Sequence, residues 1–196
     1  MGYLQYGRIG SMQKNGKKLS RAIPALLRRA GIFSRDDHGV TAIEFALLGV
    51  PFFAIVAAIM ETSLVFMASN IFETALHDTS RLIRTGQAIQ ANYDIDDFRA
   101  GMCERTYGLF NCGAIIINVR TSTSFNNITI SDPIDPATGN WTLTENFAPG
   151  QRKSIVIAEA YYKWEALFNI MGFNLATLSD GTLLMGAAEV FRNEPF

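Results

Sequence analysis

Histidine and cysteine are scarce in this 196-residue chain, which contains two of each. Neither His38 nor His77 lies in a sequence context typical of a catalytic triad or a metal-binding motif. Cys103 and Cys112 have no nearby histidine that would complete a four-ligand zinc site. The sequence therefore favours neither an enzyme nor a metal centre, and it indicates no cofactor.

Charged side chains are absent from one long stretch of the chain. There is none between Phe45 and Met60, and Glu44 is the only one between Val40 and Met60. A helix needs about 20 mostly apolar residues to cross a bilayer, whereas a core helix of a soluble protein carries polar residues every three or four positions. We therefore predict a transmembrane helix over residues 40–61, with Glu61 near enough to the far interface for its charge to reach water.

The charges on either side of this span are strongly asymmetric. Residues 1–39 carry only two acidic groups, Asp36 and Asp37, and the basic groups Arg8, Lys14, Lys17, Lys18, Arg21, Arg28, Arg29 and Arg35. The remainder is acidic overall, and the positive-inside rule then predicts a basic cytoplasmic leader over 1–39 and an exported C-terminal part. Nucleic acid is not expected as a partner, because no nucleic-acid-binding motif accompanies the basic residues.

The apolar run does not fit a cleaved secretory signal, which has an apolar core of about 7–15 residues followed by a small-x-small cleavage site. Here the run is longer, and no Ala-x-Ala sequence follows it closely. Processing on the cytoplasmic side of the span, after Gly39, fits the sequence better.

Two motifs carry a resemblance to a known family. The run Gly39-Val40-Thr41-Ala42-Ile43-Glu44-Phe45 resembles the prepilin peptidase site of type IV pilins, in which cleavage follows a glycine and glutamate is the fifth mature residue. With Glu61, the spaced cysteines and the terminal hexapeptide Phe191–Phe196, the chain looks most like the TadE-like pseudopilins of tight adherence (Tad) pilus systems. The resemblance implies cleavage between Gly39 and Val40.

The spacing within this motif has a physical explanation. Cleavage after Gly39 would create a new ammonium group on Val40, at the edge of the hydrocarbon region. Glu44 lies four residues later and so on the same side of a helix. It is expected to pair with its own terminus or with that of an adjacent subunit, which would neutralise two charges that are costly in lipid. Glu44 and Phe45 are therefore our candidates for setting subunit register; the alternative is that Glu44 merely reaches the cytoplasmic interface.

Beyond Met60 the helical pattern continues as an amphipathic extension over 62–86. Apolar or small residues recur at helical spacing, and Gly86 is a natural stop. The apolar positions are Ala68, Ile71, Phe72, Ala75, Leu76, Thr79, Leu82 and Ile83, and the opposite polar positions are Asn70, Glu73, Thr74, His77, Asp78, Arg81 and Arg84. One helix of about 45 residues is predicted, with a stripe that residues 87–196 must cover.

Residues 87–196 are predicted to form a small periplasmic domain with an antiparallel sheet, which makes the fold class α+β. Asp96 or Asp97 is expected to cap a short helix containing Phe98, Met102, Thr106 and Leu109. Residues rich in β-branched side chains predict strands over 114–120, 128–130, 154–162 and 183–191. The apolar segment 164–173 is either a short helix or a loop that touches the membrane or a partner.

Cys103 and Cys112 are both expected on the exported side, where the simplest outcome is one disulfide. Zinc binding and free thiols are the alternatives. Ser131, Asp132 and Asp135 lie among turn-forming residues and are expected to act as such; a calcium site there is a minor alternative, because the spacing does not match the known loop.

The sequence thus predicts a pilin-like structural protein in the bacterial inner membrane. The resemblance implies four partners: the major Tad pilin, another minor pseudopilin, a prepilin peptidase and the Tad inner-membrane assembly platform. The alternative is a periplasmic binding or sensor domain held by a single span with an uncleaved N-terminus.

Overall fold

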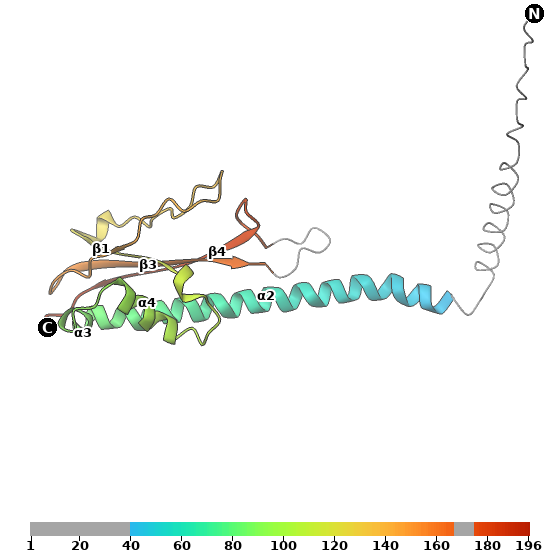
Figure 1. The fold of residues 1–196 in the computed structure, drawn as a ribbon, viewed down its shortest axis with the longest axis horizontal. Coiled ribbons are helices and arrows are strands. Elements are labelled where there is room, and N and C mark those ends of the chain that lie inside the picture. The colour runs from blue at the N-terminus through green and yellow to red at the C-terminus, as the bar shows by residue number, and fades with distance from the viewer. Residues whose placement is uncertain (1–39, 167–174) are drawn as a thin grey trace, which may run out of the picture. The chain divides into compact units, whose positions relative to one another are not determined.

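The computed structural model describes residues 40–166 and 175–196 (Figure 1). The chain divides into two compact units, residues 1–53 and 54–196, and the boundary falls within a helix. Of the first unit, the described part is helical. Among the described residues, the other helices and the strands of the sheet belong to the second unit. Gly39 lies outside the described residues, as do residues 167–173 of the segment whose structure the sequence left open; Trp164 and Glu165 at its start belong to a strand.

Helix α2 runs from Val40 to Arg84 and continues through Pro51. Its C-terminal half buries one stripe at helical spacing, and the polar positions predicted for the opposite side remain outside this stripe. The buried members beyond residue 62 are Ala68, Phe72, Ala75, Leu76, Thr79, Ser80 and Ile83. The predicted long helix is therefore confirmed.

Two helices follow α2. Gly86 adopts a φ of 82° and ends the long helix, after which α3 spans Gln87–Gln90. Helix α4 spans Ile95–Glu104 and is capped by Asp94, so the prediction of Asp96 or Asp97 as the cap was wrong. Asp97 takes the reciprocal place: it accepts a hydrogen bond from the backbone N–H of Asp94 at 3.1 Å. This capping box satisfies donors at both ends of the first turn.

Over residues 40–166 and 175–196, the sheet has four strands in the order β2-β1-β3-β4. Their bounds are Ile116–Ser122 for β1, Asn146–Phe147 for β2, Ile155–Glu165 for β3 and Thr182–Arg192 for β4. β3 pairs antiparallel with both β1 and β4, as expected, but β2 pairs parallel with β1, so the sheet is mixed rather than antiparallel. Short 3-10 turns over Cys112–Ala114 and Phe125–Asn127 flank β1.

The hydrophobic core lies between α2 and one face of the sheet, as Figure 1 shows for the C-terminal half of the helix. Small residues at the centre of β3, Ala158 and Ala160, face the helix and are fully buried. Phe72 of α2 packs against Phe110, with ring centroids 5.0 Å apart. The small side chains of β3 and the large ones of α2 belong to one core cluster.

The other face of the sheet carries a buried carboxylate, that of Glu159. It accepts hydrogen bonds from the Asn118 amide at 2.7 Å and from the backbone N–H and the hydroxyl of Ser131, both at 2.8 Å. The Arg120 guanidinium lies 3.2 Å away. Tyr161 donates to the Ser131 carbonyl at 3.0 Å, and burial raises its pKa to about 12.

This network explains why the strand predicted over residues 128–130 was wrong. Arg120 donates to the Thr129 carbonyl, and Ser131 is held by Glu159, so side chains rather than a strand ladder fix this segment on the sheet.

The turn predicted around Asp135 is confirmed. Asp135 accepts from the Ala137 N–H and the Thr138 hydroxyl, both at 2.9 Å, and the former bond is the main cause that lowers the pKa of Asp135.

A disulfide joins Cys103 at the end of α4 to Cys112, with their Cα atoms 5.7 Å apart. It closes a short loop that includes Phe110, whose ring is part of the core. The alternatives of zinc binding and free thiols do not describe this pair. On the chain-entropy model, a loop of this size stabilises the fold by somewhat under about 3 kcal/mol.

The terminal hexapeptide Phe191–Phe196 packs at the C-terminal end of α2. The N–H of Glu194 donates to the Arg84 carbonyl at 2.9 Å, which satisfies one of the acceptors left over at a helix end. Asn193 is buried and its amide donates to the Pro149 carbonyl at 2.9 Å. The motif that the sequence singled out therefore has a structural role in this fold.

Replacing Gly86 should lower the free energy of unfolding for two reasons, and Gly181 is a matched control that separates them. A Cβ at this position would clash with the Phe196 ring, and the backbone is in the left-handed region. Gly181 has a similar φ of 84° but nothing within 4 Å of a Cβ. We expect Gly181→Ala to cost about 1–2 kcal/mol through the backbone alone, and Gly86→Ala to cost about 1–3 kcal/mol more through overpacking.

Chemical denaturation of the full chain in detergent would measure both free energies of unfolding. The double variant Gly86→Ala with Phe196→Ala should lose the extra cost relative to Phe196→Ala alone. Equal costs for the two glycine variants would contradict the proposed ring contact.

Candidate functional site

The residues predicted to take part in processing and assembly lie at the start of α2. Val40 is the first helical residue, and Glu44 follows one turn later on the same helix. Glu44 is exposed, and the Phe45 side chain beside it is 70% exposed. The structure thus provides the helical spacing on which the hypothesis for Glu44 depends, whereas the roles of Gly39, Val40, Glu44 and Phe45 stay predictions.

Large apolar side chains are exposed along α2 in both units. In the first unit, seven of them between residues 43 and 53 are 60–72% exposed: Ile43, Phe45, Leu47, Leu48, Val50, Phe52 and Phe53. In the second unit, Ile59, Met60 and Phe66 are 61%, 60% and 71% exposed. Exposed apolar surface of this extent marks contact with a membrane or another protein. Within the described residues, α2 is the one helix long and apolar enough to cross a membrane.

Polar side chains within this surface donate hydrogen bonds to backbone carbonyls of the same helix. The hydroxyls of Thr62 and Ser63 donate to the carbonyls of Ala58 and Ile59, each at 2.8 Å. Such bonds lower the cost of placing a hydroxyl in lipid or against another helix.

Two observations disagree with the expectation that the apolar span ends near Glu61. The Glu61 side chain is only 4% exposed, so the expectation that it reaches water was wrong. Exposed apolar residues also continue past it: Leu64 is 41% and Met67 45% exposed. The apolar surface of α2 therefore extends beyond the region that the charge pattern marked out.

A groove lies next to this surface on the second unit. Phe66, Met67 and Ile71 line it from α2, and Arg105 and Tyr107 line it from the turn after α4. Tyr107 is 83% exposed, and its backbone adopts a φ of 53°. An aromatic side chain presented in this way adds apolar area beside the helix.

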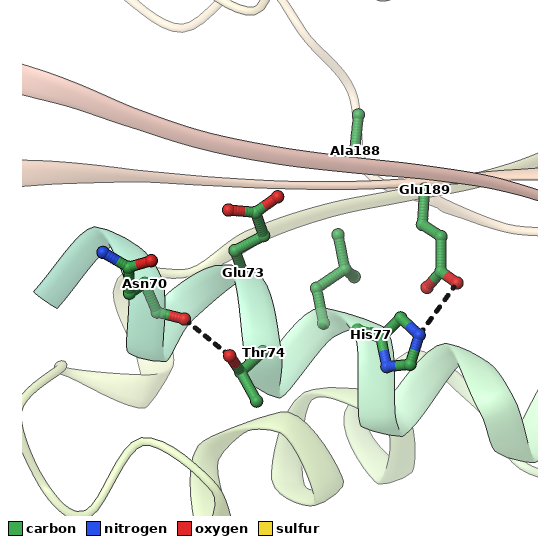
Figure 2. A pocket seen from close by; sticks show the side chains of 7 residues that line it. Asn70, Glu73, Thr74, His77, Ala188 and Glu189 are labelled. Atoms are coloured by element: carbon green, nitrogen blue, oxygen red, sulfur yellow. Dashed lines mark hydrogen bonds and ion pairs between the residues drawn. The ribbon is translucent and has the colours of Figure 1, made fainter. Parts of the chain in front are cut away.

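A separate pocket lies between α2 and β4 (Figure 2). Its lining from the helix is mostly polar, with Asn70, Glu73, Thr74 and His77 beside Leu76, and from the strand it is formed by Ala188 and Glu189. Figure 2 shows that the Glu189 side chain points toward the helix and Ala188 away from it. The Nε2 atom of His77 is 3.8 Å from a carboxylate oxygen of Glu189.

Burial raises the pKa of the Glu189 carboxyl, and the nearby His77 opposes this rise. The carboxyl therefore lies at the edge of the core, partly desolvated and close to the side chains of His77 and Arg84. Among the described residues, no three His, Cys, Asp or Glu side chains are grouped so that they could hold a metal ion.

Comparison with known families bears on α2. Residues 39–81 match the family model described as TadE-like protein. This part of the chain is TadE-like. The match agrees with the resemblance seen in the sequence; it covers most of α2 and none of residues 87–196. No curated protein and no solved structure matches the chain.

The TadE-like segment contains Glu44, Phe45 and the helical side of the pocket, but not the strand that completes it. Sequence reasoning placed Asn70, Glu73, Thr74 and His77 on the polar side of the helix and did not connect them to Glu189. The signal available was strand alternation: Met185, Ala187, Glu189 and Phe191 share one face, so a charge lies in the buried register.

The raised pKa of Glu189 predicts a pH dependence of stability. Because the folded state binds the proton more tightly than the unfolded state, the stability that this proton provides is present at low pH and is lost as pH rises through the folded pKa. Glu189→Gln should remove this loss. The variant should gain stability relative to the wild type as pH increases from about 4 to about 7.

Urea denaturation of both full chains over this pH range, together with Glu104→Gln at an exposed position, would check the prediction. A difference between wild type and Glu189→Gln that is constant with pH, or that matches the control, would show that Glu189 titrates normally.

Proposed function

We propose that this protein is a pilin-like structural subunit, anchored in the bacterial inner membrane by α2 and required for Tad pilus assembly. The observation that carries the proposal is the exposed apolar surface of α2, from Ile43 to Met67. Helical hydrogen bonds satisfy the backbone of such a segment without water, so it suits a lipid bilayer or a bundle of like helices. The TadE-like segment 39–81 covers this helix almost entirely and supports the same assignment.

The protein crosses the membrane once, with its N-terminus in the cytoplasm and the 87–196 domain in the periplasm. The basic residues preceding Gly39 and the acidic balance after it support this orientation. The disulfide between Cys103 and Cys112 supports it independently, because disulfides persist in oxidising compartments such as the periplasm.

A prepilin peptidase cleaves the leader between Gly39 and Val40. The family match begins at Gly39, and α2 begins at Val40, so the cleaved chain would start at a helix end. The new ammonium group then lies one turn from Glu44, which pairs with it within one subunit or between neighbours. The partners are the prepilin peptidase, the major Tad pilin, another minor pseudopilin and the Tad inner-membrane assembly platform.

Cleavage of the leader by the peptidase can be tested directly. N-terminal sequencing of the membrane-extracted protein should yield Val40 in cells with an active prepilin peptidase and the intact leader in cells without it. An intact leader in both strains would instead favour an anchored periplasmic binding or sensor domain.

The role of Glu44 in pilus assembly can be tested by substitution. Replacing it with alanine leaves an unpaired ammonium group at the end of the helix, so assembled pili should fall at least about tenfold while cleavage continues. Counting pili by electron microscopy, with immunoblots for the processed protein, measures both effects. Glu104→Ala, at an exposed carboxylate on α4, is the matched control. Wild-type pilus numbers in Glu44→Ala would refute the register role.

A further inference from the structure

Strand β4 lies at the edge of the sheet, because the strand order is β2-β1-β3-β4. It is 11 residues long, paired along its whole length with β3 on one side. Gly186 and Ala188 in its middle are exposed. A sheet edge presents a row of backbone donors and acceptors to any chain that approaches it.

The hydrogen bonds near the start of β4 show which residues face outward. The N–H groups of Thr182 and Leu184 donate to Asp180 and Thr177, which precede β4 and do not belong to β3. In an antiparallel pair this direction alternates, so the N–H and C=O groups of Gly186, Ala188 and Val190 also point away from β3. Over the described parts of the chain, these outward groups have no hydrogen-bond partner.

This edge has few of the features with which proteins usually prevent unwanted strand pairing, and Glu189 is its one inward-pointing charge. It contains no proline, lysine or interrupting bulge, and its pairing with β3 runs without a break from Thr182 to Arg192. Gly186 has no side chain and Ala188 carries only a methyl group, so the backbone edge is open to a second strand; the Tyr161 ring packs against one face of Gly186. Strand addition requires an edge whose outward backbone groups are free, and in β4 this holds from Gly186 to Val190.

The pocket in Figure 2 lies beside this edge and carries negative charge. Ala188 and Glu189 form its strand side, and the exposed Glu73 lies across from them on α2. His77 approaches one oxygen of Glu189, and Asn70 and Thr74 contribute neutral polar groups. Among the residues that line the pocket, two carboxylates face one histidine, and Arg84 acts on Glu189 from outside this lining, so a cationic side chain complements the pocket.

We propose that the free edge of β4 binds an extended segment of a partner protein by strand addition, and that a lysine or arginine of this segment enters the pocket between Glu73 and Glu189. Backbone hydrogen bonds to Gly186, Ala188 and Val190 give affinity, and the carboxylates select the basic side chain. A second copy of this chain fits less well, because two β4 edges paired about Ala188 would bring the Glu189 carboxylates of both copies together. The proposal does not depend on leader cleavage or on Glu44.

The test uses the full chain in detergent and three short dye-labelled peptides. The first has the sequence Thr-Val-Thr-Lys-Thr-Val-Thr; the second has glutamate in place of lysine; the third keeps the lysine but carries N-methyl groups on the amides of one edge. Fluorescence anisotropy gives the affinities up to about 1 mM peptide. Hydrogen-exchange mass spectrometry reports whether the 182–192 segment becomes protected.

We expect the lysine peptide to bind at least about tenfold more tightly than the other two and to protect residues 182–192. Glu73→Gln and Glu189→Gln should each weaken its binding, whereas Glu104→Gln should not. Ala188→Pro removes one outward N–H at a position where edge strands tolerate proline, so it should abolish binding, and Ala188→Ser, which keeps the N–H, should not.

Three results would overturn the proposal: no lysine-peptide binding or protection, equal binding of the N-methylated peptide, or equal binding of the glutamate peptide. The N-methylated peptide keeps the test valid if Ala188→Pro fails to fold, because the protein is then unchanged. Concentration-dependent self-association that protects residues 182–192 would assign the edge to a second copy and would also refute a basic partner.

Discussion

The packing of the buried stripe of α2 against one face of the sheet is the interaction on which the rest of this structure depends. Phe72, Leu76 and Ile83 have exposures of 1% or less, and the strand residues opposite them are equally buried. The polar side of the same helix is thereby fixed, and the Glu189 pocket exists only because β4 is held beside it. Helical stability of this kind comes from tertiary packing rather than from propensity.

The helix and most of the sheet could be predicted because one periodic signal dominates each of them. The charge-free run and the 62–86 pattern predict α2 to within two residues of its end at Arg84, since Gly86 can adopt the left-handed conformation that ends a helix. The β-branched runs likewise predict β1, β3 and β4 to within a few residues. The recognition motif at Gly39 is local in sequence, which is why the TadE-like match could be anticipated.

The features that could not be predicted depend on partners distant in sequence. Glu159 resembles an ordinary exposed position on a strand until Ser131 and Asn118 surround it, and no periodicity encodes that arrangement. The contact between His77 and Glu189 could not be predicted for the same reason, because it depends on how α2 packs against β4. Asp94 shows a smaller limit: three aspartates within four residues offer several caps, and backbone geometry selects one.

The sequence order of the elements has a consequence for folding. The stripe of α2 is synthesised before β3 and β4, and the long connection through α4 and β1 separates it from the strands that cover it. Contacts of such high sequence separation form slowly, because the loop entropy is lost before the contacts compensate for it. Phe72 and Leu76 are thus exposed on the newly made helix until the last strand pairs. For this interval the chain carries a second apolar surface, one that the finished fold no longer displays.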